Sequence, residues 1–217
     1  MPQESYDLKR RAKEQLNGKW VQSAIVCFIV WLLTRAFTSG SEYHTIHNVW
    51  QNGIMARSLA SKSSSGLGDL LSFILGGPVA LGAAGYFLKL MRNQGPIIED
   101  LFSGFKFFVK AFVLNLLIII FTLLWSVLLI IPGIIASLRY SMAYFIMSDN
   151  PQLSAFEALK QSKLMMVGHK WELFVLWLSF LGWFLLGVIT LGIALLWVDP
   201  YYNTTIANFY QDLKDLS

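Results

Sequence analysis

Residues 107–131 read FFVKAFVLNLLIIIFTLLWSVLLII, and this stretch decides the fold. Lys110 is the single charged residue within it, and about 20 apolar residues in helical conformation cross the hydrocarbon core of a bilayer. Pro132 and Gly133 follow at once. Because proline lacks a backbone donor and glycine permits a tight turn, this pair predicts a hairpin tip at the end of a transmembrane helix.

The composition of the whole chain also indicates a membrane protein. Of its 217 residues, 55% are hydrophobic and 14% are charged, whereas a soluble domain carries about 25% charged residues. The net charge of +4 comes from basic residues that flank apolar blocks, which favours a role in topology over nucleic-acid binding. Cys27 is the single cysteine, so no disulfide can form within the chain. The N-terminus lacks the pattern of a cleaved signal peptide, and we expect the first apolar block to remain in the mature protein.

The apolar blocks predict an all-α, polytopic membrane protein, with one membrane domain over residues 1–217. Six transmembrane helices are expected, at about 20–37, 70–91, 107–131, 134–147, 171–186 and 191–210. The last two result from dividing residues 171–198, where Gly187 and Gly192 interrupt the block. A single tilted helix over those residues is the alternative.

A weak internal repeat predicts that the six helices form three helical hairpins. Three times, a polar or amphipathic stretch leads to a glycine, a lysine and an aromatic residue that opens an apolar helix: Gly18-Lys19-Trp20, Gly104 to Phe107, and Gly168 to Trp171. Each copy is followed by an expected glycine-containing turn, at Gly76-Gly77-Pro78, Pro132-Gly133 and Leu191-Gly192. The alternative is a coincidence, because interfacial helices and glycine turns recur in membrane proteins.

The placement of lysine and arginine predicts the orientation. With the N-terminus inside the cell, thirteen of the 17 basic residues lie in inner segments and three lie outside. Cytoplasmic loops carry such an excess of basic residues. We therefore expect a multi-pass protein of the cell membrane with both termini in the cytoplasm.

Arg139 and Asp199 are the candidate intramembrane polar pair. Arg139 follows Pro132-Gly133 by about 9 Å of helix, and Asp199 follows Gly192 to nearly the same depth. A charge at membrane depth costs roughly 2.5–3.5 kcal/mol unless it finds a partner or water, and their similar depth makes a pairing of the two side chains geometrically possible. In the alternative, Arg139 extends to the outer interface and Asp199 is hydrated locally.

Residues 154–167 predict an amphipathic helix on the inner leaflet. Ser154 and Glu157 have the spacing of a capping box, and the helix carries apolar and basic edges. The residues expected to contact the inner leaflet are Lys160, Lys163 and Lys170. The alternative is a docking surface for a cytoplasmic protein.

Other motifs carry little chemistry. His44 and His47 lie three residues apart in a polar stretch, but without further ligands they fit solvated loop residues better than a metal site. No catalytic signature is present in the sequence, and we expect no catalytic residue, no metal and no cofactor. The small residues of Gly82-Ala83-Ala84-Gly85 favour close helix packing.

Nearly the whole chain, specifically in its second half and loosely in its first, resembles a bacterial family of integral membrane proteins, domain of unknown function 975. The stretches that carry the resemblance are Arg139 to Pro151, Ser154 to Ser162, Gly182 to Gly187, and Leu191 through Pro200-Tyr201 to Tyr210. The layout also looks like the membrane domains found beside glycerophosphodiester phosphodiesterases, without their catalytic domain. The resemblance implies a protein of the bacterial cytoplasmic membrane and transfers no catalytic residue.

Three functions fit these observations. The first is a non-enzymatic, envelope-associated or partner-binding membrane protein, with the lipid bilayer, a protein partner or a second copy of the chain as partners and no nucleic acid. The second is a small-molecule or lipid transporter with a polar site near Arg139 and Asp199. The third, an intramembrane enzyme, ranks lowest because carboxylates and histidines do not cluster. A cavity that reaches the polar pair would favour transport, and a dry bundle would favour the first function.

Overall fold

The computed structural model describes residues 5–35, 66–128, 130–190 and 192–216, and these residues form helices joined by short turns, without a strand. The predicted all-α class is therefore confirmed. His44 and His47 lie outside the described residues. The helices of the described ranges are α1 (Ser5–Leu16), α2 (Trp20–Arg35), α4 (Gly66–Met91), the 3-10 helix η1 (Ile98–Phe107), α5 (Phe108–Leu128), α6 (Ile130–Tyr140), α7 (Ala143–Asp149), α8 (Ala155–Met165), α9 (Lys170–Ser179), α10 (Leu181–Ile189) and α11 (Leu195–Leu216).

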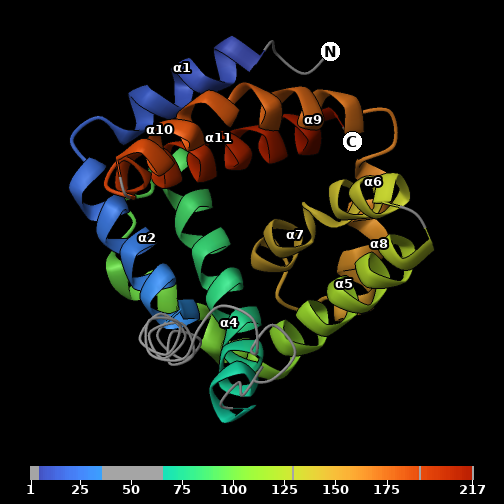
Figure 1. Ribbon diagram of the computed structural model, residues 1–217. Helices are drawn as coiled ribbons and strands as arrows, with labels where there is room; N and C mark the ends of the chain where they lie inside the picture. The colour runs from blue at the N-terminus through green and yellow to red at the C-terminus, as the bar shows by residue number, and fades with distance from the viewer. Residues whose placement is uncertain (1–4, 36–65, 129, 191, 217) are drawn as a thin grey trace, which may run out of the picture.

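Helix α4 is the centre of the arrangement. It contacts α2, η1, α5, α7 and α11, and its second half buries Tyr86, Phe87 and Leu90. Figure 1 shows α1, α9, α10 and α11 together along one end of the molecule, with α2 and α4 running away from them. Helices α5 to α8 form the other side, where α8 packs against α5, α6 and α7. The first and last helices of the chain thus lie side by side.

Small residues set how closely α4 approaches its neighbours. A Cβ atom added to Gly82 would overlap the backbone of Leu101 in η1, and one added to Gly104 would overlap the backbone of Pro78. A Cβ atom on Gly77 would likewise meet the carbonyl group of Ala111 in α5. The close packing expected from the small residues around Gly82 is present, because only glycine lets these backbones touch.

The described part of the chain contains fewer helices that could cross a membrane than the six predicted. Within the described residues, three stretches are long and apolar enough, namely Phe73–Met91, Ile98–Trp125 and Lys170–Gly187. A fourth is reached if α1 and α2, which meet at an angle of 102°, count as one bent span. The prediction of six transmembrane helices is therefore wrong for this structure.

The expected fourth and sixth helices are the ones that fail. Residues 134–147 do not form one helix, because a turn at Ser141 and Met142 separates α6 from α7, and both are far shorter than the roughly 20 residues of a span. The expected sixth helix corresponds to α11, which starts at Leu195 rather than at residue 191. Its polar residues, with Asp199 and Asn203 in its first half, make it less apolar than a span requires.

The three expected turns have three different outcomes. Gly76-Gly77-Pro78 lies inside the continuous helix α4, so the first predicted turn is wrong. Pro132-Gly133 lies inside α6, which begins at Ile130, so the second predicted turn is displaced: α5 and α6 do pack together, but the chain has reversed before this pair, and proline is tolerated in a first helical turn. Between α10 and α11, Gly192 adopts a left-handed conformation with φ +93°, and its N–H donates to the carbonyl of Gly187 at 2.7 Å. The break expected within residues 171–198 is therefore present.

Two of the three repeat copies share a turn. Gly18, before Lys19-Trp20, has φ +77°, and Gly168, before Lys170-Trp171, has φ +86°. In the second copy, Gly104 lies within η1 and serves packing instead. The repeat thus holds at the entries to α2 and α9, where a left-handed glycine redirects the chain.

Candidate functional site

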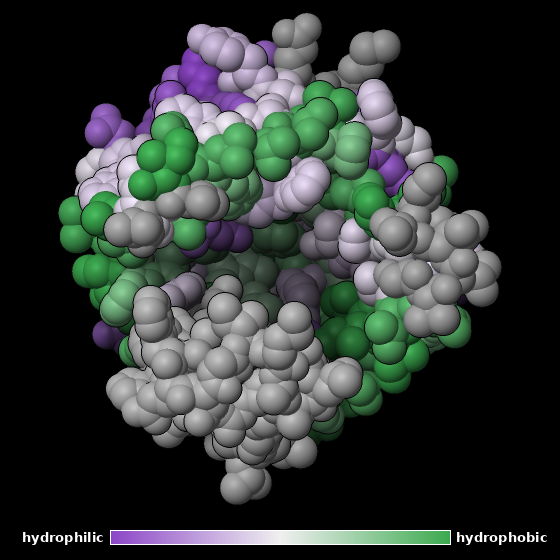
Figure 2. Space-filling view, viewed as in Figure 1, coloured by the Kyte–Doolittle hydropathy of each residue, from purple (hydrophilic) through white to green (hydrophobic). Residues whose placement is uncertain are grey.

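A cavity lies between α2, α4, α7 and α11. It consists of two adjoining hollows of about 290 and 390 Å³, which share Cys27, Trp31 and Asp199 as lining residues. We call these two hollows together the central cavity. A third hollow of about 500 Å³, between α6, α9 and α11, borders it at Ser141, Phe145 and Asn203. Figure 2 shows this face of the molecule hollowed, with hydrophilic and hydrophobic surface side by side within the hollow.

Helical spacing brings the lining residues together. Cys27 and Trp31 are four residues apart on α2, and Asp199 and Asn203 are four residues apart on α11, so each pair shares one helix face. Helix α4 contributes small side chains to the wall, with Ala80 as one of them. The small side chains on this wall of α4 leave space beside the lining residues of α2 and α11, and this space is the central cavity.

The break between α6 and α7 brings further polar groups to the wall. Ser141 lies in the turn between the two helices, and Tyr144 lies in the first turn of α7. The Tyr144 hydroxyl donates to Oδ1 of Asn115 at 2.8 Å, and the Nδ2 of Asn115 lies 3.4 Å from the carbonyl oxygen of Phe73. The glycine-lined contact of α4 with α5 is therefore accompanied by a polar link that ends at the cavity. Asn115 of α5 thereby hydrogen-bonds to both α4 and α7, as polar side chains between packed helices do.

Asp199 is the charged residue of the central cavity. It is partly buried, and it lines both hollows. Asn203 Nδ2 donates to the backbone oxygen of Asp199 at 2.9 Å rather than to its carboxylate. Across the part of the chain that the structure describes, the carboxylate has no hydrogen bond and no ion pair. A carboxylate in this setting attracts any cation or hydrogen-bond donor that enters the cavity.

The structure does not bring the predicted pair together. Arg139 lies near the end of α6, where its backbone oxygen accepts a 2.8 Å hydrogen bond from Ser162 of α8, and Asp199 lies on α11. Among the described residues no ion pair joins the two, and the Arg139 Nε atom is buried without a partner. Helix α6 packs against α5, α8 and α9, whereas α11 packs against α1, α2, α4 and α10, so the helices that carry the two residues have different neighbours.

The predicted inner-leaflet lysines lie on one surface with apolar residues. The capping box is present, since Ser154 Oγ accepts from the Glu157 N–H at 3.2 Å and Glu157 Oε2 accepts from the Ser154 N–H at 2.8 Å. Helix α8 buries Ala155, Ala158, Leu159 and Ser162 against the protein. Its outer side and the turn into α9, which we call the α8–α9 face, expose Phe156, Lys160, Lys163, Leu164, Val167 and Trp171, with Lys170 half-buried beside them.

The sequence reasoning missed a polar cluster at the end of the molecule where the termini meet. Asp149, whose side chain is 7% exposed, accepts hydrogen bonds from Arg92 at 2.6 and 2.8 Å, from Lys214 at 2.7 Å and from Tyr210 at 3.0 Å. Burial opposes the charge, but the hydrogen bonds from Arg92 and Lys214 outweigh it and hold the pKa of Asp149 below its ordinary value of 3.8. Hydrogen bonding to Asp149 in turn raises the pKa of Arg92 above its ordinary value. We call these four residues the Asp149 cluster.

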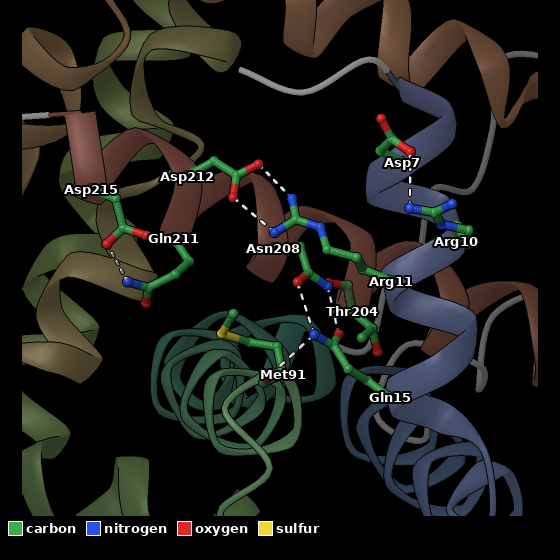
Figure 3. Close-up of polar contacts among 10 residues, drawn as sticks. All are labelled: Asp7, Arg10, Arg11, Gln15, Met91, Thr204, Asn208, Gln211, Asp212 and Asp215. Carbon is green, nitrogen blue, oxygen red and sulfur yellow. Dashed lines mark hydrogen bonds and ion pairs between the residues drawn. The ribbon is translucent and has the colours of Figure 1, made fainter. Parts of the chain in front are cut away.

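Two further contacts tie α1 to α11 beside this cluster. The Arg11 guanidinium donates to both carboxylate oxygens of Asp212, at 3.0 and 2.5 Å. Gln15 and Asn208 exchange hydrogen bonds of 3.0 and 2.6 Å between their amides, and Gln15 also donates to the Met91 carbonyl at 3.1 Å (Figure 3). The sequence gives only a weak signal for these contacts between α1 and α11. Each charged residue stands beside an apolar block and carries no indication of its partner.

Comparison with known proteins gives a family and no further relative. No curated protein and no solved structure matches the chain. The family described as "Protein of unknown function (DUF975)" matches residues 1–137 and 126–217, which together cover the whole chain. This confirms the resemblance drawn from the second half of the sequence, and the chain belongs to that family.

Proposed function

We propose that this chain is a non-enzymatic, multi-pass protein of the bacterial cytoplasmic membrane that binds a small amphipathic or lipid molecule in its central cavity, as a transporter does. The observation that carries the proposal is the cavity itself, which reaches Asp199 in a body of apolar helices. A dry, tightly packed bundle would have favoured a protein without a ligand. Binding sites for small molecules are concave and mostly apolar, with a few polar groups, and the central cavity fits that description.

Binding is preferred over catalysis because the polar groups of the cavity do not form a proton-transfer pair. General acid–base chemistry needs titratable groups within hydrogen-bond reach of each other or of the substrate. The carboxylate of Asp199 has no such partner among the described residues. Its role is therefore assigned to recognition of the bound molecule.

The orientation rests on the two termini. Because α1 contacts α11 through Arg11 and Asp212, the ends of the chain share one face of the molecule. The excess of lysine and arginine in segments expected to be inside makes this face cytoplasmic. The α8–α9 face then lies against the inner leaflet, with its lysines at anionic headgroups and Phe156, Leu164 and Trp171 at the acyl boundary.

The test is retention of a bound molecule. The full chain is purified in a mild detergent from native membranes, and bound small molecules are identified by native mass spectrometry. Ala80→Phe places an aromatic ring in the central cavity, whereas Val109→Phe adds bulk at a position 72% exposed on α5. We expect the wild type and Val109→Phe to retain the same molecule and Ala80→Phe to lose it. Equal retention by all three proteins, or none by the wild type, would refute the proposal.

A second candidate function is docking of a cytoplasmic protein on the α8–α9 face. The exposure of three large apolar residues, Phe156 at 61%, Leu164 at 61% and Trp171 at 70%, favours some contact there. The double variant Lys160→Gln/Lys163→Gln distinguishes contact of this face with lipid from contact with a cytoplasmic protein. Loss of co-purifying anionic lipid, with neutral lipid unchanged, points to lipid, and loss of a co-purifying protein with unchanged lipid content points to a partner.

A further inference from the structure

The carboxylate of Asp199 and two aromatic rings meet in the smaller hollow of the central cavity. Trp31 and Phe28 line this hollow together with Asp199. Their rings are stacked, with centroids 5.9 Å apart and planes 22° apart. The rest of the wall is aliphatic, and Ile193, Leu195 and Leu196 supply much of it. The hollow therefore brings together one carboxylate, two aromatic side chains and an apolar wall.

The charge of Asp199 is uncompensated by the described part of the chain. Of the described residues that line either hollow of the central cavity, none is basic. Ionised groups at membrane depth pair with an opposite charge or face water, because an isolated charge in an apolar medium is costly. A ligand that brings a positive charge would satisfy this requirement.

The aromatic rings favour the same kind of ligand. The face of an aromatic ring carries negative potential, and aromatic faces together with a carboxylate hold ammonium groups. An anionic headgroup would instead meet the carboxylate without a basic residue to balance it. The aliphatic wall suits an alkyl chain.

We infer that the central cavity selects a cationic amphiphile, with its ammonium group between Asp199 and the rings of Trp31 and Phe28 and its alkyl portion along the aliphatic wall. This inference rests on the proposed function and adds the charge of the ligand to it. Asp199 is the residue that sets the preference, and Asn203, one turn further along α11, borders the same space.

Cys27 allows this preference to be measured in the protein as it exists. It is the single cysteine of the chain and lines both hollows beside Asp199. Two methanethiosulfonate reagents of similar size, one ending in trimethylammonium and one in sulfonate, are applied to the full chain in lipid nanodiscs. The ratio of the two labelling rates, divided by the same ratio for 2-mercaptoethanol, reports how much Asp199 favours a cation.

The variants isolate the charge. We expect Asp199→Asn to lower the normalised ratio about tenfold, because a unit charge within several ångströms acts oppositely on the two reagents. Asp199→Glu, which keeps the charge, should preserve the ratio. Asp215→Asn makes the same change at an exposed site of the same helix and should leave it unaltered. A ratio unaffected by Asp199→Asn, or a thiol that neither reagent reaches, would overturn the inference.

Protection of Cys27 separates this inference from the proposed function. Dodecyltrimethylammonium and dodecyl maltoside are compared as protectants against a neutral maleimide. Protection by the cationic amphiphile at concentrations about tenfold lower, lost in Asp199→Asn but kept in Asp215→Asn, supports the inference. Equal protection by both amphiphiles in all proteins overturns the cation preference and leaves ligand binding standing. Protection by neither removes both.

Discussion

Replacing Asp149 with asparagine should destabilise the fold substantially, because this one carboxylate accepts four hydrogen bonds. Arg92 donates two of them, and Tyr210 and Lys214 donate one each. Breaking a fully buried ion pair costs about 3–5 kcal/mol, and an exposed pair is worth about 0–1 kcal/mol. Asp149 is 7% exposed, but Lys214 and Arg92 are 42% and 27% exposed. An intermediate loss of about 2–3 kcal/mol in the free energy of unfolding follows from these limits.

The same substitution should change how stability depends on pH. The folded-state pKa of Asp149 lies below 3.8, so its contribution is fully present above the unfolded-state value. It is lost as the pH falls through the folded-state pKa. The wild type should therefore lose its advantage over Asp149→Asn below about pH 4, where the unfolded state binds the proton first.

The assay is unfolding of the full chain in mixed micelles by increasing mole fraction of dodecyl sulfate, followed by tryptophan fluorescence at pH 6 and pH 3. Asp7→Asn is the matched control, because Asp7 contacts Arg10 at 3.4 Å in an exposed pair. We expect a loss below about 1 kcal/mol for this control. A loss for Asp149→Asn no larger than the control's, or one unchanged between pH 6 and pH 3, would refute the assignment of the Asp149 cluster as a stabilising contact.

Three other substitutions test separate features of the fold. Gly82→Val should prevent native packing of α4 on η1 and lower the free energy of unfolding by more than about 3 kcal/mol. Gly182→Val is the control, because a Cβ atom there meets nothing within 4 Å, and its unfolding midpoint should equal that of the wild type. Equal midpoints for the two variants would contradict the close approach of α4 and η1. Ser154→Ala should lower the stability of α8 by about 1 kcal/mol, which hydrogen exchange of its first-turn amides measures. Arg11→Asp should reduce stability, and adding Asp212→Arg should restore it in a double-mutant cycle; additive losses would show that the two side chains do not interact.

Much of the local structure could be predicted because its causes are local. The apolar block at 107–131 is a helix over almost the same residues, and Gly192 marks a turn where one was expected. Gly76-Gly77-Pro78 has the composition of a turn and lies within α4 instead. Contacts between distant segments decide whether such a glycine forms a turn or lies within a helix. Gly77 packs against the Ala111 carbonyl, and a local sequence pattern carries no information on that contact.

The candidate site was predictable in part. Asp199 stands out in the sequence as a charge beside an apolar block, and it does line the central cavity. Its expected partner, Arg139, lies on α6, which packs against α5, α8 and α9, and a depth counted along one helix does not tell which helices become neighbours. The Asp149 cluster could not be foreseen, because Arg92 and Lys214 reach Asp149 from positions 57 and 65 residues away.

The pairing of α1 with α11 has a consequence for synthesis of the chain. The buried face of α1, with Leu8, Ala12 and Leu16, lies against a helix that contains the last residues to be made, and Arg11 is 201 positions from Asp212. At 5–20 residues per second, the ribosome needs about 10–40 s to supply the second partner after the first. During this interval the apolar side of α1 must rest on something else, and the bilayer surface is the nearest apolar phase. The bent join to α2 would let α1 leave that surface once α11 is complete, so folding would finish by closing the chain end to end.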